Sequence, residues 1–300
     1  MRTLSCFVTL AALLASVAAA RTSVIVSFQP YETVTRNIAG PDAEVTRLVP
    51  IGASPHEFEP KPSDLRRVAA AKIVFVNGLG LDEWIVKLTR ASGTKARVVE
   101  IGERVNMTPL RGQAPTGEEH GHADEHGAVD PHIWLDASIM AKAASVIGEE
   151  LAKADPARAN AYRARAKLEH SRLMKLHTEL KALLSPVRAQ KVVTFHGAWG
   201  YWSRAYGPVV AAVVEPFPGK EPSAKYVRDV VKLLRARRAQ AVFAEPQLPS
   251  GPARVIAESA GVKLFVIAPE GTAQHPDYYA MMRANARTFL QALKSSNKRP

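Results

Sequence analysis

The stretch from Asp155 to Pro186 constrains the fold of this chain more than any other, because it predicts one long helix. Asp155 is a residue type favoured at helix N-caps, Pro156 suits the first helical position, and Pro186 marks a stop. About 29 residues without glycine or proline lie between these signals, and at 1.5 Å per residue they would span about 43 Å. A helix of that length can bridge two lobes, although a long surface helix of a single domain would show the same pattern.

Short apolar runs alternate with helix patterns on both sides of this stretch. About four strand-helix units precede it and about four follow it, an alternation that is typical of parallel sheets covered by helices on both faces. We therefore expect an α/β fold with two (β/α)4 lobes, each with a parallel sheet, joined by a long rigid helix. The expected lobes span residues 21–154 and 187–300, with the connecting helix at 155–186.

The first twenty residues have the three-part pattern of a secretory signal peptide. Arg2 is followed by an apolar run over residues 4–14 and by small residues that end at Ala20. The run is shorter than the roughly 20 apolar residues that span a bilayer, so we expect cleavage near Ala20 and a soluble periplasmic protein. The only cysteine, Cys6, lies inside this segment, and the mature chain would therefore have no disulfide, thiolate ligand or cysteine nucleophile.

The charge balance limits the partners of the chain. Lysine and arginine number 40 against 28 acidic residues, which gives a net charge of +12. A basic surface favours acidic partners or anionic lipid headgroups. The export signal, and the lack of a basic stretch interleaved with aromatic residues, argue against a nucleic-acid partner.

Three of the nine histidines lie at predicted strand-to-helix junctions. His56 lies in the loop after LVPIG, His132 lies just before a helix cap, and His196 directly follows KVVTF. In open α/β sheets ligands bind at the carboxyl ends of the strands, so a cleft between two lobes could bring these side chains together. Three imidazoles suit Zn²⁺, which needs one more ligand to complete a tetrahedron. The alternative for each histidine alone is a structural or solvated role.

Carboxylates near these histidines are candidates for orienting the rings or for the fourth ligand. Asp277, before the last predicted helix, is a candidate ligand or simply the N-cap of that helix. His275 is a weaker candidate ligand. A hydrogen bond to the second ring nitrogen of a histidine would fix its tautomer, and the acidic residues placed to accept it are Glu57, Glu59, Asp130 and Asp136, with helix capping as the expectation for Asp136. Glu245, at the end of a buried strand, is a candidate carboxylate behind the site, a partner for a nearby cation, or a metal ligand. The His-rich loop 118–127 has a composition that binds metals weakly or forms a solvated loop.

Five motifs carry a resemblance to a known family: GASPHEFEP, VDPHIWLD, TFHGAWGYWSRAYG, VFAEPQ and DYYAMMRANA. In this order, with a rod-like helix between the second and the third, the chain resembles the periplasmic metal-binding proteins of zinc and manganese ABC importers over essentially its whole mature length. The resemblance implies two (β/α)4 lobes, a rigid connecting helix and a metal in the cleft. It places His56, His132 and His196 at the family's three histidine ligands, with Asp277 at the final carboxylate.

The resemblance also indicates which branch of the family is nearer. Manganese-carrying members resemble this pattern but tend to have a carboxylate where this chain has His196, whereas a third imidazole and a His-rich loop resemble the zinc branch. The chain departs from that branch in its shorter loop, in Phe58 where tyrosine is frequent, and in lacking a disulfide.

We therefore expect a non-enzymatic solute-binding protein that captures Zn²⁺ and delivers it to an ABC permease at the inner membrane. A periplasmic metallochaperone is a second candidate partner, and a monomer is expected. The alternatives are a manganese or iron carrier of the same class, or a secreted zinc hydrolase, although no HExxH helix accompanies the histidines.

Overall fold

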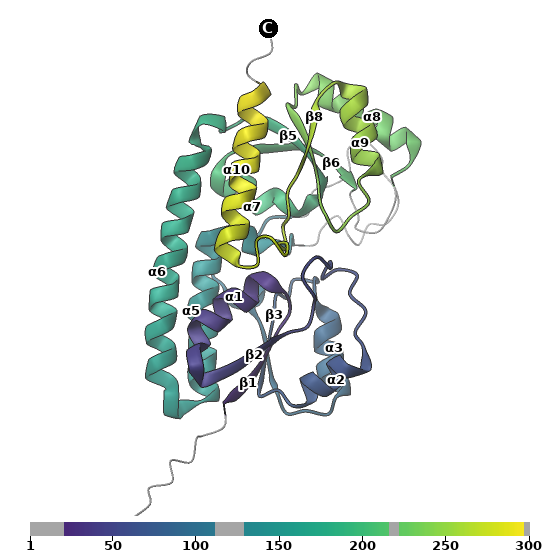
Figure 1. Cartoon of the computed structure of the whole chain (residues 1–300). Helices are drawn as coiled ribbons and strands as arrows, with labels where there is room; N and C mark the ends of the chain where they lie inside the picture. The colour runs from purple at the N-terminus through teal and green to yellow at the C-terminus, as the bar shows by residue number, and fades with distance from the viewer. Residues whose placement is uncertain (1–20, 112–128, 216–221, 297–300) are drawn as a thin grey trace, which may run out of the picture.

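The computed structural model describes residues 21–111, 129–215 and 222–296 and contains two four-stranded parallel sheets, one in each lobe (Figure 1). The strand order is β2-β1-β3-β4 in the N-terminal lobe and β6-β5-β7-β8 in the C-terminal lobe. The strands are β1 (Thr22–Val26), β2 (Ala43–Arg47), β3 (Ile73–Val76), β4 (Arg97–Glu100), β5 (Lys191–His196), β6 (Val209–Glu215), β7 (Ala241–Ala244) and β8 (Lys263–Val266). The predicted α/β class with two parallel sheets is confirmed.

Both sheets have the same topology, in which the order of the strands reverses next to the first strand. The second strand of each lobe pairs on one side of the first, with Val24 opposite Val45, and the third strand pairs on the other side. The crevice for a ligand in such sheets lies at this switch point, beyond the carboxyl ends of the strands. The topology therefore directs the ligand to the ends of β1, β3, β5 and β7.

Helices flank both sheets (Figure 1). The helices are α1 (Gln29–Ala39), α2 (Pro62–Ala69), α3 (Glu83–Ala91), α4 (Ile101–Arg104), α5 (Ala137–Ala154), α6 (Ala159–Leu184), α7 (Gly200–Tyr206), α8 (Ala224–Ala236), α9 (Gly251–Ala260) and α10 (Tyr278–Ser296). Helix α6 packs along α5, and it also contacts α1 of the first lobe and α10 of the second. The predicted long helix between the lobes is confirmed.

The start of this helix differs from the prediction. Asp155 is not its N-cap, because the chain first makes a short 3-10 turn at Pro156–Arg158, and α6 then has 26 residues from Ala159 to Leu184. The carboxylate of Asp155 instead accepts hydrogen bonds from Thr22 Oγ1 at 3.2 Å and Tyr162 Oη at 3.2 Å and pairs with Arg158. These tertiary contacts fix Asp155 at the corner between α5 and α6.

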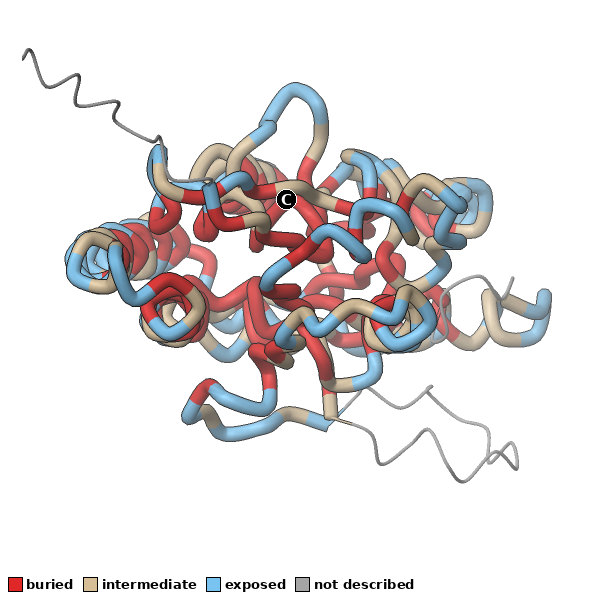
Figure 2. The backbone as a smooth tube through the Cα atoms, turned by 90° about the horizontal axis from the view of Figure 1, so that it is seen from below, coloured by how far each residue is buried: buried red, intermediate tan, exposed pale blue. Residues whose placement is uncertain are grey.

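The largest apolar core is continuous between the lobes. It includes Val24 and Phe75 from the first sheet, Phe243 from the second, and buried faces of α5, α6 and α10. Smaller clusters lie under α2 and α3 and under α8 and α9. Figure 2 shows buried residues at the centre and exposed residues along the outer faces of the helices. Because one core joins the lobes, the structure favours small relative movements of the lobes over wide opening.

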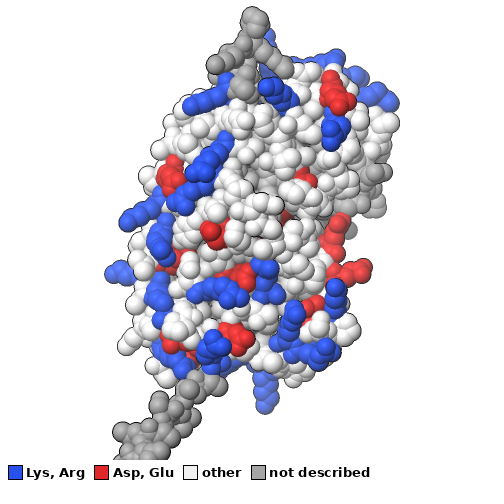
Figure 3. All heavy atoms as spheres, in the orientation of Figure 1, with Lys and Arg blue, Asp and Glu red and all other residues white. Residues whose placement is uncertain are grey.

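The face of the molecule drawn in Figure 3 is mixed in charge, with lysine and arginine on both lobes and acidic side chains between them. Within the described part of the chain, none of the helices has the length and apolar character needed to cross a bilayer. The residue boundaries predicted for the two lobes and the connecting helix stay predictions.

Candidate metal centre

His56 reaches the site from the loop between β2 and α2. The loop is attached to α3, because Trp84 Nε1–H donates to the carbonyl of Pro55 at 3.1 Å and the ring of Phe58 packs on Trp84 with centroids 4.9 Å apart. The backbone N–H of His56 donates to Ser54 Oγ at 3.2 Å. His56 is half-buried, so its ring faces the site from a loop that is supported by aromatic packing.

His132 is held by Asp130 two residues earlier. One carboxylate oxygen of Asp130 accepts both the backbone N–H of His132 at 3.0 Å and its Nδ1 at 2.7 Å. The neighbouring carbonyl of Pro131 accepts from Asn77 Nδ2 at 3.0 Å, which ties this segment to the end of β3. Asp130 and His132 are both buried. Because Nδ1 of His132 faces a carboxylate, its Nε2 is left to face the site. The predicted role of Asp130, to bond the second ring nitrogen of a histidine, is confirmed.

His196 occupies the last position of β5 in the second lobe. Its Nδ1 lies 2.7 Å from Glu245 Oε2, at the end of the adjacent strand β7. The other oxygen of Glu245 accepts from Trp199 Nε1 at 3.1 Å. The prediction that Glu245 stands behind the site is therefore confirmed, and this residue orients His196 in the way that Asp130 orients His132.

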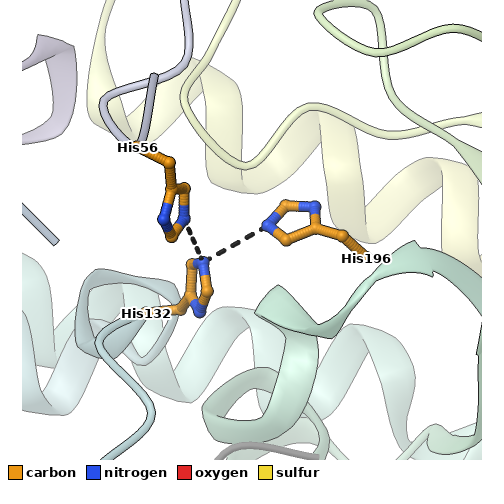
Figure 4. A group of neighbouring side chains, drawn as sticks. All are labelled: His56, His132 and His196. Carbon is orange, nitrogen blue, oxygen red and sulfur yellow. Dashed lines mark hydrogen bonds between the residues drawn. The ribbon is translucent and has the colours of Figure 1, made fainter. Parts of the chain in front are cut away.

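The three imidazoles converge through their Nε2 atoms (Figure 4). His56 Nε2 and His132 Nε2 are 3.1 Å apart, and His196 Nε2 and His132 Nε2 are 3.3 Å apart. Two nitrogens bound to one Zn²⁺ at tetrahedral angles, each at 2.0–2.1 Å, would be about 3.3 Å apart. Among the described residues, these three histidines form the group of ionisable side chains with metal-ligand geometry, and their ligand atoms lie within 4.8 Å of one another.

The other predicted site residues lie elsewhere. Asp277 caps helix α10, where its Oδ1 accepts from the backbone N–H of Ala280 at 2.8 Å, and it is outside the histidine group. His275 is exposed, with its Nδ1 3.4 Å from Thr272 Oγ1. Asp136 caps α5 through the N–H of Ser138 at 2.8 Å, which confirms the capping role expected for it.

Two further predictions concern exposed or undescribed positions. Glu57 and Glu59 are exposed. The His-rich loop 118–127 lies outside the described residues.

Burial and charge both lower the pKa of two of the rings, and they act in opposite directions on the pKa of the third. Burial, together with the neighbouring imidazoles, lowers the pKa of His56 and of His132 well below the ordinary value. Burial also acts to lower the pKa of His196, but the carboxylates of Glu245, Glu270 and Asp130 together outweigh it and raise that pKa to about 9. Burial raises the pKa of Asp130 to about 7. In the metal-free protein at neutral pH, His56 and His132 are therefore neutral and ready to ligate, whereas a proton on His196 competes with the metal.

Glu270 is a buried carboxylate near this site that the sequence interpretation missed. It is 4% exposed and accepts a hydrogen bond from Gln247 Nε2, which also lies 3.2 Å from Glu245 Oε2. Burial and the charge of Glu245 raise the pKa of Glu270. Glu270 follows strand β8, so the same strand-end argument that found Glu245 could have found it.

The fold and the site together define the class of this protein. Two α/β lobes that bring two histidines from loops and one from the end of a strand to one point define a metal-binding protein. The chain belongs to the ZnuA family, described as the periplasmic component A of a zinc-uptake complex, whose sequence profile matches residues 24–292. This family consists of non-catalytic substrate-binding proteins, periplasmic or extracellular, that act with an ABC transporter, which implies a permease partner.

Individual relatives cover nearly the whole chain. The manganese ABC transporter substrate-binding lipoprotein PsaA of Streptococcus anginosus is 28% identical over 274 residues, which are 87% of this chain and 85% of PsaA. The crystal structure of a zinc-bound ZnuA with residues 138–173 deleted has a TM-score of 0.80 at 26% identity and covers 91% of this chain and 98% of that one. The solute-binding protein FpvC of Pseudomonas aeruginosa, in complex with Ni²⁺, has a TM-score of 0.79 at 30% identity, with 94% and 100% covered.

Proposed function

We propose that this protein captures Zn²⁺ at His56, His132 and His196 and delivers it to an ABC permease at the inner membrane. The observation that carries the proposal is the convergence of three Nε2 atoms from both lobes at spacings of 3.1 and 3.3 Å. Carboxylates behind two of the rings keep Nε2 directed at the metal.

The donor set supports zinc as the substrate. Imidazole nitrogens suit Zn²⁺, whereas Mn²⁺ prefers carboxylate, carbonyl and water oxygens. The second candidate is a manganese or iron carrier of the same importer class. It is favoured by the similarity to the manganese lipoprotein PsaA and to FpvC, which has been crystallised with Mn²⁺ as well as Ni²⁺.

The fourth ligand is proposed to be a carboxylate of the segment between β8 and α10. Asp277 is the candidate that the sequence indicates. To bind the metal, its carboxylate would have to give up the hydrogen bond that it accepts from the backbone N–H of Ala280. Glu270 is the second candidate, because it is buried and its charge acts on His196. A crystal structure of this protein with zinc bound distinguishes them, because the carboxylate oxygen of the true ligand should lie about 2.0–2.2 Å from the metal.

The remaining steps concern export and delivery. We propose export with cleavage near Ala20, function as a monomer, and a periplasmic metallochaperone as a further partner. The secreted zinc hydrolase considered from the sequence is set aside, because the family is non-catalytic.

A competition titration tests the choice of metal. Purified protein is stripped of metal and titrated with Zn²⁺ against a chromophoric chelator, alone and in the presence of Mn²⁺. The proposal expects one Zn²⁺ per chain and no displacement by an equal concentration of Mn²⁺, and it expects His132→Ala to abolish tight binding. Preferential binding of Mn²⁺, or zinc binding that is unchanged in His132→Ala, would contradict it.

A further inference from the structure

The segment between β8 and α10 is bonded to both lobes. Within its own lobe, the backbone N–H and carbonyl of Ala268 both bond to the side chain of Asn285 on α10, at 2.9 Å each. Towards the first lobe, Tyr278 N–H donates to Thr33 Oγ1 on α1 at 3.1 Å. Residues 267–278, called the bridging segment below, therefore connect the two halves at the level of the site.

Trp134 makes two further hydrogen bonds between the first lobe and this segment. Its Nε1–H donates to the carbonyl of Pro269 at 2.8 Å, and its own backbone carbonyl accepts from Tyr278 Oη at 2.6 Å. Both bonds are buried, and Trp134 has no exposed surface. A buried carbonyl that loses its partner carries the full cost of desolvation, so the bridging segment is fixed to Trp134 at two points.

Trp134 also touches a metal ligand. Its ring packs against the imidazole of His132 with centroids 5.2 Å apart, and against Phe28 at 4.6 Å. The same side chain thus contacts a histidine of the first lobe and a segment that belongs to the second. Glu270, whose charge acts on His196, is the residue directly after Pro269.

We propose that Trp134 is a positioning residue that couples His132 to the bridging segment, so that the Trp134–Pro269 hydrogen bond slows the release of bound metal. Metal departure requires His132 and His196 to move apart, and they come from different lobes. As long as the bridging segment is bonded to both, that movement must break a buried hydrogen bond. This inference rests on the proposed metal site but not on which metal fills it.

The test compares two tryptophans that differ in this bond. Trp134→Phe removes the indole N–H and keeps an aromatic ring. Trp202→Phe is the matched control, because Trp202 is also fully buried and its Nε1 has no hydrogen-bond partner among the described residues. The probe is Zn²⁺, loaded into the full-length mature protein, and its dissociation rate is measured by stopped flow with excess chelator.

Loss of one buried hydrogen bond should accelerate dissociation by about five- to tenfold in Trp134→Phe, whereas Trp202→Phe should stay within about twofold of the wild type. Tyr278→Phe, which removes the second bond to Trp134, should also accelerate release and serves if Trp134→Phe does not fold. Equal rates for Trp134→Phe and Trp202→Phe, or a wild-type rate in both Trp134→Phe and Tyr278→Phe, would overturn the inference. Absence of bound Zn²⁺ in the wild type would instead refute the proposed function.

Discussion

Replacing Glu245 with glutamine should change the pH dependence of metal binding more than its strength at neutral pH. In the wild type the Glu245 carboxylate lies 2.7 Å from His196 Nδ1 and, together with Glu270 and Asp130, raises the pKa of His196 to about 9. A metal must displace the proton on that ring, so apparent affinity falls about tenfold for each pH unit below this value. At pH 7 the proton would weaken wild-type binding by about 100-fold relative to a deprotonated site.

The substitution has two opposing effects. Loss of the carboxylate that orients a histidine ligand weakens intrinsic affinity by about 10- to 100-fold. It also removes the negative charge nearest to His196, so the pKa of this ring falls and the proton competes less with the metal at pH 7. We therefore expect Glu245→Gln to bind zinc more weakly than the wild type at pH 9, by about 5- to 50-fold, and equally or more tightly at pH 7.

Competition with a chromophoric chelator at pH 6.5, 7.5 and 8.5 measures this difference. The logarithm of the dissociation constant should fall with a slope near −1 per pH unit in the wild type and should fall less steeply in Glu245→Gln. Glu169→Gln is the matched control, because Glu169 is equally buried but bonds Asn37 and Tyr279 away from the histidines. Parallel slopes for the wild type and Glu245→Gln would refute the reasoning.

Two other predictions concern the contact between α5 and α6 and the apolar core that joins the lobes. Gly148→Ala should lower the melting temperature by about 2–10 °C, because the added Cβ would lie 2.2 Å from Ala166 Cβ at the contact of α5 with α6. Gly251→Ala is the control, because its added Cβ would meet open space. Equal melting temperatures for the two variants in calorimetry would contradict the expectation. Since one apolar core joins the lobes, metal-free and metal-bound crystals should differ by only a few degrees of lobe rotation, and a rotation of tens of degrees would show that the core does not restrain them.

The sheets and the three histidines could be predicted from the sequence because they depend on local patterns. Buried strands read as short apolar runs; His196 ends such a run and His56 lies in the loop after one, whereas His132 lies just before a helix. Parallel strands place their carboxyl ends at one edge, so the convergence of these side chains followed from the order of the elements. The orienting role of Asp130 was also predictable, since it lies two residues from its histidine.

Features that depend on contacts between distant residues could not be predicted in this way. Asp155 has the residue type of an N-cap, but hydrogen bonds from Thr22 and Tyr162 place it at a corner instead. The bond from Trp134 to Pro269 joins positions 135 residues apart, and no pattern in either segment indicates it. Asp277 was ambiguous because a carboxylate before a helix is both a good cap and a good ligand.

The most direct test of the central claim is an anomalous difference map, collected at the zinc edge, from crystals of the purified protein grown with one equivalent of Zn²⁺. The structure predicts a single strong peak about 2.0–2.1 Å from the Nε2 atoms of His56, His132 and His196. A peak at other residues, or none between these three rings, would contradict the assignment of this site as the place where the metal is carried.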